Sequence, residues 1–381
     1  MLLPCQRQLF DLPDDVVYLN CAYMGPLPRD SARAGEEAVR LKQQPWEIQP
    51  KDFFEPVERV RELFAQIIRA ETDDIAIVPS ASYGLAVAAH NVAVEKDQEI
   101  LILEDQFPSN VHVWRELALK KGARLKTIRR PKPGSNTGWT APILDAISER
   151  TAVAALPHCH WTDGGLVDLV AVGKKLRAFG AALVLDLTQS AGAWPFDVRK
   201  VKPDFVAAAA YKWLLGPYAL SFLYAAPHRQ EGDPIEYSWM NRARAENFAR
   251  LVDPRHEYAP GARRFDMGEK AQFQLLPIAE ASLDRLLRWE VENIAETLTA
   301  MNGAIAERAA ALGLSCLPEG LRAGHYLGID FPHGMPPKLI KRLTERNIHV
   351  SLRGKSMRVT PHLYNTEEET GFLMETLEEV L

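Results

Sequence analysis

Between about Ile75 and Ala225, short apolar runs alternate with amphipathic stretches of helical period. Runs such as EILILED (99–105) and AALVLDL (181–187) are largely apolar on both sides, which is typical of strands covered on both faces. The stretches between them, such as NVHVWRELALKKG (110–122), predict helices that join successive strands. This order constrains the fold more than any other feature, because buried strands joined by helices form a doubly wound, mostly parallel α/β sheet.

The pattern changes after about Gly268. One long helical pattern covers Leu276–Leu312, and short strands and helices then follow to the end of the chain. We therefore expect an N-terminal arm (1–20) packing on the small domain, a large domain (21–267) and a smaller α/β C-terminal domain (268–381).

Charge and cysteine usage exclude several classes of protein. The net charge is −5, from 45 basic and 50 acidic residues, so no basic excess favours nucleic-acid binding. The N-terminus lacks the basic and long apolar segments of a signal peptide, and we expect a cytoplasmic location and no membrane partner. The four cysteines lie far apart without a CxxC pair, which argues against a zinc ribbon or a disulfide scaffold: Cys5, Cys21, Cys159 and Cys316.

A single lysine, Lys212, interrupts the apolar run FVAAAAYKWLLGPYALSFLY (205–224). A transmembrane helix has this length, but a central lysine costs about 2.5–3.5 kcal/mol on insertion scales. The Gly216-Pro217 pair would also break such a helix. A snorkelling lysine needs an exposed edge. A third interpretation is a functional lysine, since buried lysines have lowered pKa values and act as nucleophiles. The residues around Lys212 must decide between the three.

Polar and aromatic residues follow several predicted strands, where ligands of open α/β sheets bind. Asp186 ends one strand, Phe107 follows another, and Ser80 and Ser82 lead into a helix. Lys212 and Asp186 are compatible with a structural ion pair, but the whole set matches the needs of pyridoxal 5′-phosphate (PLP). That cofactor needs a lysine for the imine, a carboxylate for the pyridine nitrogen, a helix N-terminus for the phosphate and an aromatic plane.

These motifs resemble the class V aminotransferase family of fold-type I PLP enzymes, which includes isopenicillin N epimerase-like enzymes, kynureninases and cysteine desulfurases. The resemblance runs from about Tyr18 to the C-terminus, and its specific part is Asp-x-x-Gln-Ser-x-Gly followed by Lys and Gly-Pro. The segments that carry it are YLNCAYMGPLP, VPSASYGL, EDQFPSN, VLDLTQSAGAWPFDV, DFVAAAAYKWLLGP, RRFDMGEKA and SMRVTPHLYNTEEE.

The resemblance assigns the cofactor site. It implies that Lys212 forms the imine, that Asp186 pairs with the pyridinium, and that Gln189 bonds the ring hydroxyl. It implies a stacking role for Phe107. Further cofactor contacts are implied near the phosphate and the ring hydroxyl for Ala81, Ser82, Tyr211, Trp161, Thr162 and Gly268.

The resemblance also assigns the substrate site and the assembly. Arg358 would hold the substrate α-carboxylate bidentately, with Tyr23 beside it and Arg353 as a second candidate. A homodimer with active sites at its interface is implied, in which Gly268 would reach the neighbouring phosphate. Glu269 would repel a phosphate there. The segment 234–265, rich in arginine and aromatics, is predicted to be a loop region near the active-site mouth or the partner subunit.

Differences between this sequence and the motifs of desulfurases and kynureninases limit the reactions that we expect. The stretch VSLRGKSMRV has no cysteine before Arg358, which argues against a desulfurase. Gln189 in place of histidine, and the lack of an SNPP-like segment, weaken a kynureninase. We expect transamination of an amino-acid-like substrate, with an epimerase or a C–S or C–C lyase as the alternative.

Two readings from other classes stay open. His158 and His160 are two residues apart, so on a strand they would share a face and could ligate a metal with Asp186 in a hydrolase. Further ligand motifs are absent, so we expect no metal. A catalytically inactive binding protein on the same fold is the other reading, and the intact Lys212–Asp186 pair argues against it.

Overall fold

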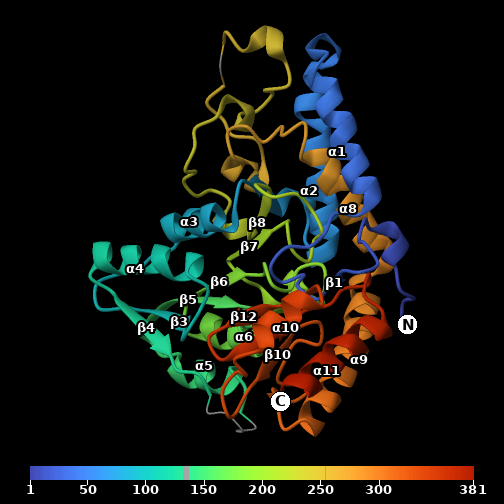
Figure 1. The fold of residues 1–381 in the computed structure, drawn as a ribbon. Coiled ribbons are helices and arrows are strands. Elements are labelled where there is room, and N and C mark those ends of the chain that lie inside the picture. Colours follow the sequence, from blue (N-terminus) through green and yellow to red (C-terminus); the bar gives the residue numbers. More distant parts are fainter. Residues whose placement is uncertain (132–136, 254) are drawn as a thin grey trace.

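The computed structural model describes residues 1–131, 137–253 and 255–381. Its centre is a seven-stranded sheet in the order β2-β8-β7-β6-β5-β3-β4 (Figure 1). Strand β8 is antiparallel to both of its neighbours, and all other pairs are parallel. The strands are β2 (Ile75–Val78), β3 (Glu99–Leu103), β4 (Arg124–Ile128), β5 (Thr151–Pro157), β6 (Ala182–Asp186), β7 (Phe205–Ala209) and β8 (Ser221–Ala225).

Helices cover both faces of this sheet. In β6, Leu183 and Leu185 enter one apolar core while Ala182 and Val184 enter the other, as the two-residue period of a strand requires. The helices are α1 (Arg29–Lys42), α2 (Glu55–Ile68), α3 (Ala81–Asn91), α4 (Ser109–Lys121), α5 (Thr140–Ala146), α6 (Leu169–Ala178) and α7 (Val198–Val201). The prediction of a doubly wound, mostly parallel sheet is confirmed.

The apolar run 205–224 is not a helix. It forms β7, a loop and most of β8, with Phe205 opposite Ala225 and Ala209 opposite Ser221. Within the described ranges, no helix is long and apolar enough to cross a membrane. The run is apolar because both strands are buried on both faces, and Lys212 lies in the loop between them.

The C-terminal part contains a four-stranded antiparallel sheet in the order β12-β13-β10-β9. The first strand of the chain, β1 (Val17–Tyr18), pairs with β11 (Ile348–His349), so the N-terminal segment packs against this part. The predicted domain boundaries stay a prediction. The remaining elements here are β9 (Ser315–Cys316), β10 (Leu327–Asp330), α10 (Leu339–Glu345), β12 (Ser351–Arg353), β13 (Ser356–Val359) and α11 (Glu367–Val380).

The long helical pattern Leu276–Leu312 is two helices, α8 (Leu276–Trp289) and α9 (Val291–Ala311). They meet at Glu290, whose φ of 63° is left-handed and ends the first helix. Helix α8 packs on α1 and α2, whereas α9 packs on the C-terminal sheet. The apolar period could not show the break, because glutamate is an ordinary helix former.

The segment 234–265 has no α-helix or strand among its described residues, and Pro254 lies outside them. Its backbone forms three 3₁₀ turns and projects at the top of Figure 1 in yellow. The 3₁₀ helices of the chain are η1 (Arg7–Leu9), η2 (Pro45–Glu47), η3 (Pro50–Phe53), η4 (Thr72–Asp74), η5 (Pro227–Arg229), η6 (Trp239–Asn241), η7 (Phe248–Arg250) and η8 (Gly261–Phe265).

Candidate active site

A cavity of about 290 Å³ opens at the carboxyl ends of the central strands. Pro157 ends β5 and Asp186 ends β6, and the two residues are partners in the parallel register, so their side chains reach the same edge of the sheet. Predicted site residues that line this cavity are Ala81, Ser82, Phe107, Trp161, Asp186, Gln189, Tyr211 and Lys212.

Lys212 lines this cavity and is buried, with 6% of its surface exposed. Its Nζ lies 5.4 Å from the centre of the Phe107 ring and 5.5 Å from that of Tyr211. Burial lowers the pKa of Lys212 to about 8; Asp186 opposes this shift, and Arg358 and Arg353 add to it. A substantial fraction of the side chain is therefore a neutral, nucleophilic amine near pH 8.

The loop that carries Lys212 is held in an unusual backbone conformation. Leu215 (φ 51°) and Ala219 (φ 65°) both adopt the left-handed region, which costs non-glycine residues free energy and persists only where the surroundings impose it. Gly25 N donates to Tyr211 O at 2.9 Å, and a Cβ on Gly25 would lie 2.2 Å from Lys212 O. Only glycine permits this approach, so the N-terminal segment packs directly against the backbone of the loop that carries Lys212.

Asp186 faces the same cavity and is 8% exposed. Its Oδ1 accepts from Thr188 N at 3.0 Å. Across the described parts of the chain it forms no ion pair within 4 Å with Lys212 or any other cation, which is unusual for a buried carboxylate. The structural ion pair considered from the sequence is therefore wrong, and both groups point into a shared space.

The N-terminus of α3 forms another wall. Ser80 caps this helix by accepting from Tyr83 N at 3.1 Å, and its hydroxyl shares a 2.9 Å hydrogen bond with Ser82. Unpaired amides and the helix dipole make such an end suited to a phosphate group.

Aromatic and amide groups complete the walls. Phe107 and Trp161 meet edge to face at 5.4 Å. The amide of Gln189 already accepts from Trp213 Nε1 and donates to Ala22 O, both at 3.1 Å. Among the described residues the second N–H of this amide has no partner, so it can donate to a ligand.

Arg358 lies on β13 and is 2% exposed. Its Nη1 donates to Trp161 O and to the Tyr326 hydroxyl, both at 3.2 Å. Tyr23, which is 56% exposed, does not line the cavity. Its hydroxyl is nevertheless near enough to Arg353 to influence the pKa of that guanidinium, which burial and Arg358 lower.

Two predicted cofactor residues lie outside the cavity. The Thr162 hydroxyl accepts from Arg130 Nη2 at 2.9 Å and bonds His160 Nδ1 at 2.8 Å. Gly268 N donates to Glu236 Oε2 at 2.7 Å. The geometry of one chain gives neither residue a place at the site, and the role of each stays a prediction.

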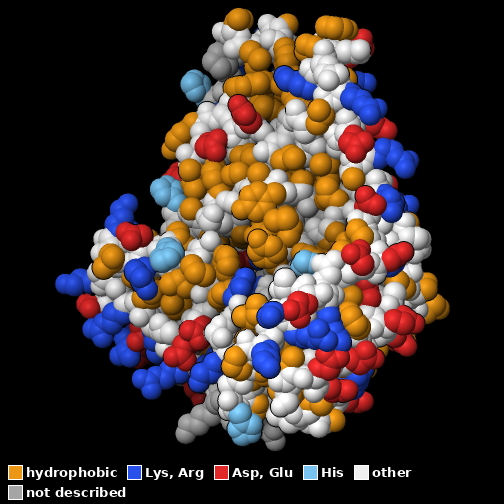
Figure 2. All heavy atoms as spheres, in the orientation of Figure 1, with side chains coloured by type: hydrophobic (Ala, Val, Ile, Leu, Met, Phe, Trp, Pro, Cys, Tyr) orange, Lys and Arg blue, Asp and Glu red, His pale blue; other side chains and the backbone are white. Residues whose placement is uncertain are grey.

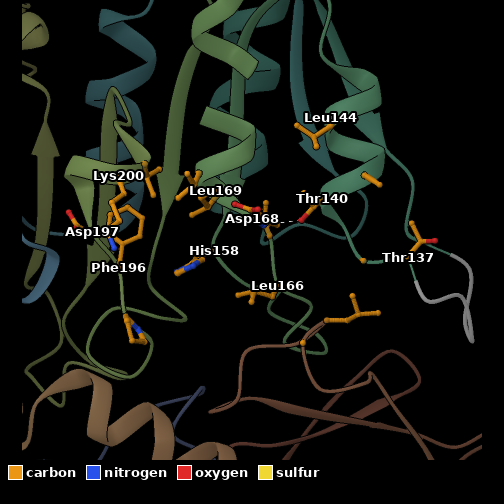
Figure 3. Close-up of a pocket in the computed structure, with 18 of the residues that line it drawn as sticks. Thr137, Thr140, Leu144, His158, Leu166, Asp168, Leu169, Phe196, Asp197 and Lys200 are labelled. Carbon is orange, nitrogen blue, oxygen red and sulfur yellow. Dashed lines mark hydrogen bonds between the residues drawn. The ribbon is translucent and has the colours of Figure 1, made fainter. Parts of the chain in front are cut away.

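The proposed metal ligands do not converge. His158 lines a second cavity of about 820 Å³, next to Phe196 and Leu166 (Figure 3), whereas Asp186 lines the first. His160 stacks on Trp139 and bonds Glu104 O at 3.0 Å. Strand β5 ends before both histidines, so the two-residue period no longer applies to them. The residues that the structure describes contain no group of three or more suited to hold a metal ion.

Sequence reasoning missed two features of the site. Tyr218 lines the cavity and packs on Tyr211 with ring centres 4.7 Å apart; its place after Gly-Pro was the only signal. The second feature is a buried ion cluster in which Asp266 binds Arg61 and Lys270. Asp266 Oδ1 also accepts from the backbone N of Ile77 at 2.7 Å, so the cluster fixes the strand that leads to the α3 cap. Arg61 and Asp266 are 205 positions apart, which no local pattern reveals.

The lowered pKa of Lys212 leads to a prediction for the protein without ligands. The rate of reductive methylation at Lys212 should rise with pH up to about 8 and then level off, because only the neutral amine reacts. Exposed lysines ordinarily titrate near about 10.4, so those of the same protein are an internal control. Peptide mapping by mass spectrometry measures both, and a rate at Lys212 that tracks the exposed lysines would contradict the prediction.

Several known proteins are similar to this chain. The Aminotransferase class-V profile matches residues 49–370. An uncharacterized aminotransferase of Bacillus subtilis (strain 168), YcbU, is 29% identical over 322 residues, covering 84% of this chain and 82% of that protein. Isopenicillin N epimerase of Streptomyces clavuligerus is 27% identical over 263 residues, covering 68% and 66%. A solved C-DES variant with glycine covalently linked to its PLP cofactor has a TM-score of 0.88 at 18% identity, covering 99% of this chain and 100% of that chain, which shows a shared fold.

Proposed function

The chain belongs to the class V aminotransferase family of PLP-dependent enzymes, and from this we propose that it transfers the amino group of an amino-acid-like substrate. One observation carries the proposal: Lys212 and Asp186 are both buried, face one cavity and do not pair with each other. Two opposite charges separated in a dry pocket are stable when a ligand lies between them.

The cavity residues fit the cofactor. The α3 N-terminus would hold its phosphate, Phe107 would cover its ring, and Asp186 would keep a proton on its ring nitrogen. When bound, PLP supplies an electron-withdrawing ring that stabilises negative charge at the substrate α-carbon. The free carboxylate oxygen of Asp186 and the buried, unpaired Lys212 are what such a ligand requires.

The remaining roles fall on this chain's own groups. Arg358 would orient the substrate through its α-carboxylate, since a guanidinium fork matches a carboxylate. Lys212 Nζ would take the proton from the substrate α-carbon, for which a pKa near 8 is well suited. The atom to which Lys212 returns that proton decides between transamination and the alternative, epimerisation. A C–S or C–C lyase would use the same base, and the similarity to isopenicillin N epimerase keeps the epimerase as the second candidate.

The second part of the proposal is a homodimer. Large apolar side chains are exposed, among them Tyr23, Met24 and Tyr218, and Tyr218 also lines the cavity. Figure 2 shows apolar side chains gathered over the middle of one face, around a hollow with basic side chains at its lower edge. An exposed apolar region of this kind is typical of a protein–protein interface, and a symmetric dimer is the commonest assembly.

One preparation tests these points. The purified protein with added PLP should show a visible absorption band that borohydride removes, with a pyridoxyl mass on the Lys212 peptide. The protein should then transfer amino groups from amino acids to a 2-oxo acid, and its mass in solution should be twice 42.7 kDa. A colourless protein that takes up no PLP would refute the cofactor site. Racemisation or elimination without transfer would favour the alternative reactions.

A further inference from the structure

Two arginines share one face of the C-terminal sheet beside the cavity. Arg353 on β12 and Arg358 on β13 lie on adjacent antiparallel strands, where Ser351 is opposite Arg358 and Arg353 is opposite Ser356. Because side chains repeat every two residues, both arginines project from the same face. Each guanidinium carbon lies against the indole of Trp161, at 5.7 Å from the ring centre for Arg353 and 5.8 Å for Arg358.

Neither arginine has an acidic partner among the residues placed by the structure. Buried Arg61 is paired with Asp266, and partly buried Arg130 is paired with Asp163. Arg322 is also buried and, like Arg353 and Arg358, forms no ion pair with a described residue. Arg358 bonds only neutral oxygens and leaves its buried Nε without a partner, and Arg353 donates to Leu352 O at 2.7 Å. Both arginines lower the pKa of Lys212, because their positive charges are close enough to disfavour its protonated form.

An excess of positive charge in a site partly shielded from solvent is stabilised when anions bind there. A single α-carboxylate accepts the fork of one arginine and leaves the other cation facing it unpaired. Tyr23 is near enough to Arg353 to influence the pKa of its guanidinium, and its hydroxyl is a candidate further donor to an anion. The site therefore has donors for two carboxylates.

We propose that Arg353 and Arg358 together select a substrate with two carboxylates, with Arg358 binding the α-carboxylate and Arg353 the side-chain carboxylate. The substrate class is an α-amino dicarboxylic acid or the corresponding 2-oxo dicarboxylic acid. This assignment rests on the proposed function for the place of the α-carbon, but the preference for two carboxylates is a binding property that can be measured without turnover.

The test is calorimetric binding of unreactive probes to the holoenzyme. Succinate and glutarate carry two carboxylates, and their monoamides, succinamate and glutaramate, have the same size and one charge fewer. The wild type should bind one of the dicarboxylates about 10- to 100-fold more tightly than its monoamide, the range expected of a charged hydrogen bond. Arg353→Gln should abolish this preference without weakening the monoamide, and Arg353→Lys should keep part of it.

Lys355→Gln is the matched control, because it removes one positive charge from the exposed turn of the same hairpin. Lys355→Gln should keep the preference for dicarboxylate over monoamide. If this variant lost the preference as fully as Arg353→Gln, the cause would be the overall positive charge of the hairpin, and the assignment to Arg353 would be wrong. Equal binding of dicarboxylate and monoamide by the wild type would also overturn the proposal. This result is expected if an acidic residue of a second copy of the chain pairs with Arg353. Aspartate and glutamate should likewise exceed asparagine and glutamine in kcat/KM.

The two proposals fail separately. A dicarboxylate preference without turnover of any amino acid would refute the proposed function and support the paired-arginine site. Turnover with no preference for acidic over amide substrates, and no dicarboxylate preference in binding, would support the function and refute the site.

Discussion

Replacing Lys212 with alanine is expected to lower kcat/KM by about 10²- to 10⁴-fold for every amino-acid substrate, the range of a lost general base. The effect should be large because no second lysine lines the cavity in the described chain. The fold should survive, because the amine forms no ion pair within the described residues and burial already disfavours its charge. Steady-state kinetics and thermal unfolding of the same preparation measure both effects.

Chemical rescue distinguishes a lost base from a lost shape. Small amines such as methylamine should restore part of the activity of Lys212→Ala, because the deleted side chain leaves room at the cavity base. Lys200→Ala, on an exposed residue of α7, is the control and should behave as wild type. Activity of Lys212→Ala within a factor of ten of wild type, without added amine, would refute the assignment.

Asp266→Ala should lower the free energy of unfolding by about 3–5 kcal/mol, the cost of leaving buried charges without their partner. Asp266 binds Arg61 at 2.9 and 3.1 Å and Lys270 at 2.9 Å, and all three side chains are almost completely buried. The substitution would leave Lys270 without an ion-pair partner among the described residues and Arg61 with Glu58 alone. Urea denaturation of the protein without cofactor measures the decrease in the free energy of unfolding, provided that the wild type and the variant have the same m value, the slope of that free energy against urea concentration.

Asp73→Asn is the control for this experiment. Asp73 also binds an arginine, Arg263, at 2.6 Å, but its side chain is 63% exposed, so the change should cost less than about 1 kcal/mol. Equal losses in the two variants would show that burial is not what makes the Asp266 cluster important.

The sequence predicted those parts of the molecule that depend on local patterns. Continuous apolar runs such as β6 revealed the buried parallel sheet, and residues at strand ends, such as Asp186, share one cavity because the topology brings those ends together. The direction of β8 was not predicted, because a strand buried on both faces has the same composition whether it runs parallel or antiparallel.

Other features depend on contacts between distant segments. Thr162 turns to Arg130 rather than to the cavity, since the backbone beyond Pro157 has left the strand. The break at Glu290 and the partners of Asp266 are likewise set by tertiary packing, which overrides local propensity.

The pairing of β1 with β11 has a consequence for the order of folding during synthesis. Nearby, Ser351 Oγ donates to Asn20 Oδ1, a contact between residues 331 positions apart. The ribosome releases the chain from its N-terminus, so the first strand waits without a partner until nearly all of the polypeptide has emerged. The N-terminal segment also holds Gly25 under the lysine loop, so a nascent chain can complete its central sheet well before that loop is secured.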